Sequence, residues 1–332
     1  MPLSGAMDLS PFDRAAKRIP SIAVSLVDGG SRHVGGVGDL TGTSGVETLC
    51  WEIGSISKVF TGILLADMTM RGEVDLDDAI GLHVPADVAG RLPSLAEQPT
   101  LRDLATHTAG LPRLPRSWVR RIGKDPNPYA SLTEVDVWQE LGPSIVRPKR
   151  RRVRYSNFGM GLLGHLLGHT AGAPYADLVA DRVLRPLGLN ATGVALGTPV
   201  PGVRGKDRPT PPWTFGALQG AGAIRSTVSD MLAFAEAVIE PPGTPVGAAL
   251  RLAAAPAYQG RIVATGLGWQ MRYDGVLWHN GGTYGAASFI AVDVEKQRAI
   301  VAFGNRGPRL TAPLDRAAWR TFDLMGRNRT SL

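Results

Sequence analysis

Cysteine is almost absent from this chain of 332 residues, because Cys50 is the only one. A single cysteine excludes an intramolecular disulfide, and we expect Cys50 to be a small, buried apolar residue near a helix. The chain also has no run of about 18 apolar residues, so no transmembrane helix is predicted. The start of the chain lacks the apolar stretch of a secretory signal, which predicts a soluble, cytoplasmic protein.

Motifs of several other protein classes are missing as well. The sequence has no CxxC, HExxH, EF-hand loop, GxxxxGK[ST] or GxSxG pattern, which argues against zinc, calcium and nucleotide-phosphate sites and against an α/β-hydrolase. His165 and His169 have helical spacing, but no third ligand accompanies them, so we interpret them as packing residues. We therefore expect no cofactor and no metal ion. The net charge of +7 has no nucleic-acid-binding motif beside it, and we expect neither nucleic acid nor membrane as a partner.

What is present is an ordinary globular composition, with 44% hydrophobic and 20% charged residues. Segments with strand character lie near both chain ends and helical segments lie between them. We expect an α+β fold, in which an antiparallel sheet is built from both chain ends, flanked by helices, and carries an inserted, mostly helical domain. The predicted sheet domain is 1–72 plus 251–332, the predicted insert is 73–250, and their junction holds the site. The predicted strands are 21–27, a run to about 38, 48–53, 268–273, 287–294 and 299–305, and the predicted helices are 55–71, 100–107, 133–141, 158–170, 175–184, 226–239 and 312–325.

Ser55 and Lys58 form the only S-x-x-K pattern in the chain, at the start of a segment with amphipathic helical periodicity. Their i, i+3 spacing places the two side chains next to each other on one helix face. A serine hydroxyl needs a neighbouring base to act as a nucleophile, and a lysine with a lowered pKa can be that base. The alternative is that Ser55 only caps the helix and that Lys58 is solvated.

Two further patterns are candidates for a site. Tyr155 and Asn157 form the only Y-x-N pattern, between a Pro/Arg loop and a predicted helix. A tyrosine beside cations can move a proton, and an asparagine can hold a carbonyl group. Residues 279–282 read HNGG, just before a predicted strand, and small residues there allow a substrate to lie against a strand edge. Taken singly, each pattern is equally compatible with ordinary packing.

The order of these three patterns resembles the active-site elements of the serine β-lactamase and penicillin-binding-protein superfamily. The resemblance is greatest to class C β-lactamases, DD-carboxypeptidases and related esterases, and it covers about residues 20–305. Further segments are similar to motifs of that family, namely 101–112 (LRDLATHTAGLP), 154–159 (RYSNFG), 222–231 (GAIRSTVSDM), 266–269 (GLGW) and 279–282 (HNGG).

The resemblance implies roles for individual residues. Ser55 would be the nucleophile that forms an acyl-enzyme, and Lys58 and Tyr155 would exchange its proton. Asn157 would orient the substrate. Backbone N–H groups of Ser55 and Gly282 would form an oxyanion hole.

His279, Asn280 and Gly281 correspond to the triplet that lines the substrate in this family. His279 stands where β-lactamases commonly carry lysine, and we expect it to be partly neutral near pH 7. That weakens the case for a dedicated β-lactamase, whose substrates carry a carboxylate that a permanent cation would hold.

A basic run directly precedes Tyr155, because five of the six residues 149–154 are Lys or Arg. It is either a solvated loop, or it keeps Lys58 and Tyr155 partly deprotonated and attracts an anionic substrate. We also expect residues 113–130 to form part of the pocket wall. The residues singled out there are Arg113, Trp118, Arg120 and Arg121.

Three functions remain open on the sequence. The main hypothesis is a serine esterase or transacylase that acts on a small-molecule ester or amide, possibly anionic, with an amine or alcohol as a second acceptor. The alternative is a DD-peptidase, a D-amino-acid peptidase or a β-lactamase. A ligand-binding descendant of the fold without activity is the third, and retention of Ser55, Lys58 and Tyr155 argues against it.

Overall fold

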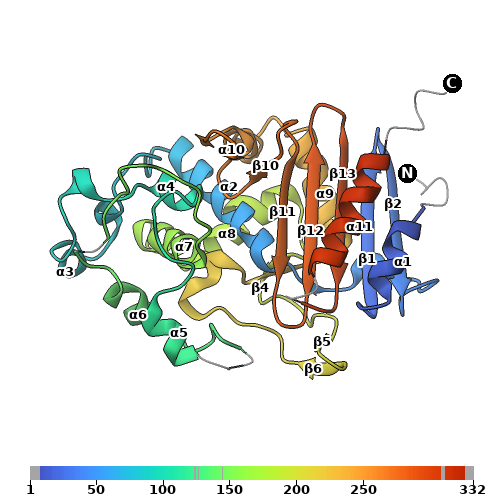
Figure 1. The fold of residues 1–332 in the computed structure, drawn as a ribbon. Coiled ribbons are helices and arrows are strands. Elements are labelled where there is room, and N and C mark those ends of the chain that lie inside the picture. The colour runs from blue at the N-terminus through green and yellow to red at the C-terminus, as the bar shows by residue number, and fades with distance from the viewer. Residues whose placement is uncertain (1–7, 123–124, 126, 144, 308–310, 326–332) are drawn as a thin grey trace.

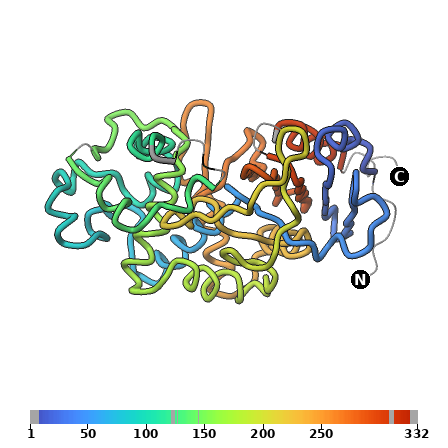
Figure 2. The backbone as a smooth tube through the Cα atoms, turned by 90° about the horizontal axis from the view of Figure 1, so that it is seen from below, coloured from blue at the N-terminus to red at the C-terminus, as the bar shows by residue number. Residues whose placement is uncertain are grey.

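The computed structural model of the chain describes residues 8–122, 125, 127–143, 145–307 and 311–325. A sheet flanked by helices occupies one end of the molecule, and helices and long loops occupy the other (Figure 1). The view from below shows the N-terminal and C-terminal segments together at the sheet end (Figure 2). The α+β fold, with strands from both chain ends in one sheet, is therefore confirmed.

The main sheet has eight strands in the order β2-β1-β13-β12-β11-β10-β9-β8, and every neighbouring pair is antiparallel. Its first hairpin turns at Gly29 and Gly30, whose φ angles of 54° and 85° favour glycine. The strands are β1 (Ser21–Asp28), β2 (Ser31–Gly38), β8 (Tyr258–Gln259), β9 (Ala264–Thr265), β10 (Gln270–Met271), β11 (Leu277–Gly282), β12 (Ala287–Asp293) and β13 (Arg298–Gly304).

Helices cover both faces of this sheet. Helix α11 (Thr311–Leu324) packs on β12 and β13 on one face, and α9 (Val228–Ile239) packs on β1 and β13 on the other. Alternate residues of one strand therefore enter two different cores: Phe289 lies in the core under α11, and Ile290 lies in the core under α9. Burial on both faces explains why the central strands read as continuous apolar runs.

Helix α1 packs against α11 at the sheet end, and most of the remaining helices and small sheets build the other end of the molecule. Thr100 caps α4 and Thr133 caps α6, each with a complete capping box, at the first residues of the helices predicted over 100–107 and 133–141. The helices are α1 (Asp13–Ala16), α2 (Ser57–Met70), α3 (Ala86–Ala89), α4 (Leu101–Ala105), α5 (Arg116–Ile122), α6 (Glu134–Gln139), α7 (Asn157–Ala171), α8 (Tyr175–Val179) and α10 (Pro245–Ala254). Two smaller sheets contain β3 (Trp51–Glu52), β4 (Gly193–Val194) and β7 (Ile224–Ser226), and β5 (Gly202–Arg204) with β6 (Arg208–Thr210).

Several predicted boundaries differ from the observed ones. The sequence missed β11 and α10, and the strand predicted over 268–273 is only the two residues of β10. The helix predicted over 175–184 changes after α8 to a π-helical turn, Ala180–Leu184. The division into 1–72 plus 251–332 and 73–250 stays a prediction, and α9, inside the predicted insert, packs on the main sheet.

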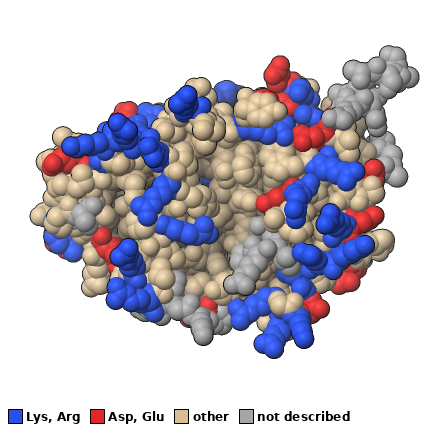
Figure 3. Space-filling model, viewed as in Figure 1, with Lys and Arg blue, Asp and Glu red and all other residues tan. Residues whose placement is uncertain are grey.

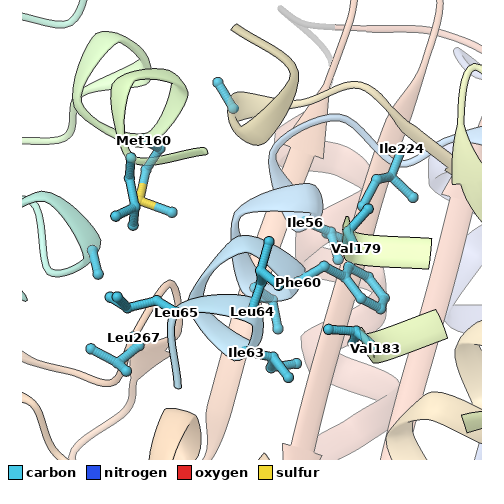
Figure 4. Packing of buried hydrophobic residues seen from close by; sticks show 14 of the residues in the cluster. Ile56, Phe60, Ile63, Leu64, Leu65, Met160, Val179, Val183, Ile224 and Leu267 are labelled. Carbon is cyan, nitrogen blue, oxygen red and sulfur yellow. The ribbon is translucent and has the colours of Figure 1, made fainter. Parts of the chain in front are cut away.

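Helix α2 is the centre of the larger core. All of its residues from Ser57 to Met68 are buried, so the expectation of an amphipathic helix is wrong. Elements from the whole chain surround it, including α7, α10 and the 3-10 helix η8 (Gly216–Ala221). Figure 4 shows Phe60, Leu64 and their apolar neighbours around this helix. A helix enclosed on all sides needs no polar face, and polar residues on it are consequently unusual.

In the part of the chain that the structure describes, no helix combines the length and apolar character needed to cross a membrane.

Candidate active site

The side chains of Ser55 and Lys58 meet at the start of α2. Ser55 lies in the short 3-10 helix η3 (Gly54–Ile56), one turn ahead of Lys58. Nζ of Lys58 donates to Oγ of Ser55 over 2.9 Å and to the backbone oxygen of Ala221 over 2.6 Å. Neither η3 nor α2, both fully within the described chain, has a side-chain cap, and Lys58 is 0% exposed. The alternative of a capping serine beside a solvated lysine is therefore wrong.

Burial lowers the pKa of Lys58. Loss of water around the amine holds the pKa of Lys58 well below its usual 10.5, and the charge of Arg113 lowers that pKa further. A neutral amine carries a lone pair. The 2.9 Å contact can therefore also form in the other direction, with Oγ of Ser55 donating its proton to Lys58.

Tyr155 lies on the other side of Ser55. Its hydroxyl is hydrogen-bonded to Ser55, and its ring lies 4.9 Å from Nζ of Lys58 and 5.4 Å from the guanidinium of Arg113. Burial of the hydroxyl raises the pKa of Tyr155 to about 12, although Ser55 and Arg113 oppose that rise. Tyr155 is therefore a protonated phenol at neutral pH. The expectation that nearby cations keep it partly deprotonated is wrong, because the loss of hydration outweighs their charge.

The cation that acts on this pair is Arg113. It perturbs both Lys58 and Tyr155, whereas no residue of 149–154 is among the causes of either pKa shift. Part of the basic run is engaged elsewhere: Arg151 lies 3.3 Å from the buried carboxylate of Asp103. Attraction of an anionic substrate by this run stays a prediction.

The predicted pocket wall is only partly what the sequence suggested. Trp118 is 3% exposed and packs edge-on against Phe158, with ring centroids 5.2 Å apart, so it is a core residue. Arg113 is the residue of this group that reaches the site. Arg120 is exposed on α5, and the side chain of Arg121 lies outside the described residues.

His107 is a site residue to which the sequence assigned no role. Its ring lies 4.6 Å from that of Tyr155, and its Nδ1 accepts a hydrogen bond from the backbone N–H of Ser156 over 3.2 Å. Its backbone oxygen accepts from the N–H of Arg154 over 2.7 Å. Burial and the charge of Lys58 hold the pKa of His107 well below its usual 6.5. A neutral His107 therefore fixes the backbone on both sides of Tyr155, and the only signal for it was its place in segment 101–112.

Asn157 lies at the first position of α7, which the Oγ of Ser156 caps by accepting from the N–H of Gly159 over 2.8 Å. The Nδ2 of Asn157 donates to the hydroxyl of Tyr129 over 2.9 Å. Its Oδ1 is buried without a hydrogen-bond partner among the described residues. An unpartnered buried acceptor is costly. No local pattern could have identified Tyr129, which a loop brings here.

The predicted triplet 279–281 lies on β11, where burial alternates along the strand. His279 and Gly281 face the Ser55 side, with the ring of His279 6.3 Å from that of Tyr155. Asn280 lies on the other face, where its Nδ2 donates to Asp315 on α11 over 2.7 Å. The structure therefore does not bring the side chain of Asn280 into the site, because neighbouring residues of a strand point to opposite faces.

His279 is neutral. Burial, followed by the charge of Lys58, lowers the pKa of His279 to about 3. Its Nδ1 lies 2.6 Å from the backbone oxygen of Asn280, which can only accept, so Nδ1 carries the proton. Nε2 is left as a buried acceptor without a partner among the described residues. His279 was expected to be partly neutral near pH 7, and with a pKa of about 3 it is fully neutral there.

Gly281 and Gly282 bring β11 against the backbone of Ser55. A Cβ on Gly281 would meet the backbone oxygen of Ile53 and the Oγ of Ser288, and it would lie 2.9 Å from the N of Ser55. Only glycine fits this approach. The space-filling view shows the molecule hollowed in the region where α2 and β11 meet in Figure 1 (Figure 3).

Other residues that the sequence singled out lie outside this cluster. His165 and His169 both pack against Trp138, and no group of three metal-binding side chains occurs among the described residues. Cys50 is partly exposed, with its Sγ 3.5 Å from the backbone oxygen of Leu196. The expectation of a buried Cys50 is therefore wrong, because β3 and the loop after β4 leave its side chain at the surface.

The sequence and fold are similar to those of known proteins. Beta-lactamase of Escherichia coli strain K12 is 26% identical over an alignment that covers 93% of this chain and 90% of the relative. D-alanyl-D-alanine-carboxypeptidase/endopeptidase AmpH of the same organism is 30% identical over 54% of this chain and 46% of the relative. Beta-lactamase-like protein 2 of Dictyostelium discoideum is 29% identical over 42% of this chain, and the match spans only 25% of that relative.

A class C beta lactamase from Rhodobacter sphaeroides has the same fold, with a TM-score of 0.78 at 23% identity over 95% of this chain and 97% of that one. The family model described as Beta-lactamase matches residues 10–322. The chain therefore belongs to the β-lactamase family and has the class C β-lactamase and DD-carboxypeptidase-like fold.

Proposed function

We propose that this protein is a serine hydrolase of the β-lactamase and DD-peptidase type, which cleaves an amide bond through an acyl-enzyme on Ser55. The observation that carries the proposal is the 2.9 Å contact between Oγ of Ser55 and Nζ of Lys58. Burial lowers the pKa of that lysine well below its usual value, which favours the neutral amine that can take the serine proton.

The two protonation states suggest a route for the proton. Oγ of Ser55 attacks the substrate carbonyl carbon while its proton passes to Nζ of Lys58. When the tetrahedral intermediate collapses, the C–N bond breaks and the leaving amine takes a proton from the hydroxyl of Tyr155, which regains one from Lys58. In deacylation, a water molecule gives a proton to Lys58 and Tyr155 and attacks the acyl carbon. The bond between the acyl group and Oγ of Ser55 then breaks, and Oγ takes that proton back.

Backbone and amide groups would hold the reacting carbonyl. The N–H groups of Ser55 and Gly282 lie where β11 meets η3, and a single donor of this kind lowers a barrier by about 2.7–4 kcal/mol. The unpartnered Oδ1 of Asn157 would accept an N–H from the substrate. Both features suit an amide that has a donor next to its carbonyl group.

The relatives favour an amide substrate over the esterase or transacylase that the sequence suggested first. Their names are Beta-lactamase and D-alanyl-D-alanine-carboxypeptidase/endopeptidase. We therefore place β-lactams and D-alanyl-D-alanine peptides ahead of simple esters as substrates.

An esterase or transacylase remains the second candidate because of His279. With a pKa of about 3, His279 presents no positive charge to a substrate carboxylate at neutral pH. Esters without a carboxylate lose nothing from its neutrality, and an amine or alcohol could replace water as the acyl acceptor.

The test is a panel of nitrocefin, a D-Ala-D-Ala peptide and short p-nitrophenyl esters, assayed with the wild type, with Ser55→Ala and with Ser94→Ala as an exposed serine control. We expect turnover in the wild type and in Ser94→Ala, and loss in Ser55→Ala. Mass spectrometry of the quenched wild type should show the acyl group on Ser55. Turnover that survives in Ser55→Ala would refute the assigned nucleophile.

The panel also separates the two candidates. A larger kcat/KM for nitrocefin or the peptide than for the esters supports the amide hydrolase. The reverse order, with a new amide or ester product when an amine or alcohol is added, supports the esterase or transacylase. A folded wild type that is never acylated by any of these substrates or by a fluorophosphonate would contradict both, and would favour a ligand-binding protein.

A further inference from the structure

Four arginines line one groove on the side of the sheet that faces away from Ser55. The groove lies between α1 with its following turn and α11, and its volume is about 410 Å³. Arg14 and Arg18 border it from the first element, and Arg316 and Arg320 border it from α11. Arg316 and Arg320 have i, i+4 spacing within α11, so their guanidinium groups lie on the same face of that helix, whereas Arg18 follows the end of α1 at Ala16. Lys and Arg side chains gather over α1 and α11 in Figure 3.

The floor of the groove is apolar and firmly packed. Ala15 is 2% exposed and Ala317 is 5% exposed, and both belong to the core under α11. Pro11 and Pro313 complete the lining. The two arginine pairs are therefore held by a fixed scaffold, while their charged ends reach solvent.

Carboxylates do not neutralise this cluster. Within the described chain, none of the four arginines forms an ion pair, and the one hydrogen bond of their side chains joins Nε of Arg316 to the backbone oxygen of Ala312. Asp8 attracts Arg320 and therefore offsets part of its charge without forming an ion pair, and its carboxylate accepts a hydrogen bond from the N–H of Ser10 over 2.9 Å.

The other charged groups nearby do not change this balance. Asp13 on α1 and Lys17 directly after α1 are exposed and carry opposite charges. On α11, Asp315 accepts from Asn280 and Asp323 accepts from Arg272. Like charges at i, i+4 repel each other, so an anion that enters the groove relieves repulsion as well as forming new bonds.

We propose that this groove is a binding site for a small molecule that carries two or more phosphate groups. Guanidinium groups match phosphate oxygens in a bidentate fork, and two pairs on facing elements can hold two phosphates at once. The volume is that of a small-molecule site. The apolar floor offers no competing donor or acceptor and leaves room for an organic group between the charged ends.

The test measures binding of pyrophosphate, tripolyphosphate and ADP to the full chain by calorimetry in 0.15 M NaCl, with orthophosphate and sulfate at equal ionic strength as references. We expect saturable one-to-one binding of the oligophosphates and at least about tenfold weaker binding of the references, because a single phosphate engages only one arginine pair. The melting temperature should rise with oligophosphate concentration.

The double variant Arg14→Gln/Arg320→Gln removes one arginine from each side. We expect at least about tenfold weaker pyrophosphate binding and an unchanged melting temperature without ligand. The matched control Lys17→Gln/Arg261→Gln loses the same charge from exposed positions outside the groove and should bind like the wild type.

Three results would overturn the proposal. One is equal binding by the two double variants, which would make the effect one of net charge. Another is equal affinity for orthophosphate and pyrophosphate. The third is binding only to anionic vesicles or to nucleic acid without saturable oligophosphate binding, which would assign the cluster to a macromolecular surface.

Discussion

The imidazole of His107 lies against the ring of Tyr155, with their centroids 4.6 Å apart. The same histidine holds the backbone on both sides of that tyrosine, through Ser156 and Arg154. It does so from a left-handed conformation with φ of 59°, which most residues adopt only at a cost. The position of the Tyr155 hydroxyl beside Ser55 therefore depends on His107, although the hydrogen bonds of His107 go to Ser156 and Arg154 and not to that hydroxyl or to Ser55.

Replacing His107 should accordingly separate two effects. In His107→Ala, the left-handed strain and the lost acceptor for the Ser156 N–H should lower the free energy of unfolding by about 1–3 kcal/mol. In His107→Asn, the side chain tolerates the left-handed conformation, so stability should largely return while kcat stays reduced because the ring contact with Tyr155 is gone. Urea unfolding and steady-state kinetics measure both. Wild-type kcat in His107→Ala would show that Tyr155 needs no such support.

Helix geometry and chain order made part of this site predictable. The i, i+3 spacing of Ser55 and Lys58 places their side chains together in any helix, and the structure does so. The strand period could also have separated His279 from Asn280, but β11 was not among the strands predicted from the sequence pattern, and only the family resemblance indicated a strand there.

The features of the site that the sequence did not predict depend on tertiary contacts. The burial of Lys58 cannot be derived from its own helix, since elements from the rest of the chain enclose α2. Tyr129 and Arg113 reach the site from loops, and loop positions carry no periodic signal. The pKa of Tyr155 is raised because burial removes water from its hydroxyl. The sequence showed only the neighbouring positive charges, which would lower that pKa.

The close approach of β11 to η3 makes Gly281 a sharp test of site geometry. In Gly281→Ala the new Cβ would meet the backbone oxygen of Ile53 and crowd the N–H of Ser55. We expect a loss of about 1–3 kcal/mol in the free energy of unfolding and a fall in kcat larger than the rise in KM. Gly243→Ala is the control, because nothing lies within 4 Å of its Cβ position. Near-normal kcat in a folded Gly281→Ala would argue against an oxyanion hole at this contact.

The neutral state of His279 predicts a pH effect on stability with a definite sign. Its pKa is about 3 in the folded protein against a usual 6.5, so the unfolded chain binds an extra proton between those values. The stability that neutral His279 provides is present above pH 6.5 and is lost as the pH falls towards 3. His279→Gln should therefore lose less stability than the wild type over this window, which urea unfolding at pH 7, 5.5 and 4.5 measures. Identical pH dependence in both proteins would mean that His279 is protonated normally.

Lys58→Met should lose turnover, and its free energy of unfolding should differ from that of the wild type by an amount that depends on pH. The folded pKa of Lys58 lies well below 10.5, so the unfolded chain binds the extra proton in the window between the two values. Within it, the free energy of unfolding of the wild type should rise with pH relative to Lys58→Met, by up to about 1.4 kcal/mol per pH unit. Chemical unfolding at pH 7, 8 and 9 measures this difference.

The control is Lys206→Met, at an exposed position, which should follow the wild type in stability and in turnover. Lys58→Met should lose turnover at every pH, because no other base lies within hydrogen-bond distance of Oγ of Ser55 except the protonated Tyr155 among the described residues. A constant stability difference from pH 7 to 9 would mean that Lys58 stays charged when buried. Because a charged amine has no lone pair for the serine proton, that result would also remove the base from the proposed acylation step.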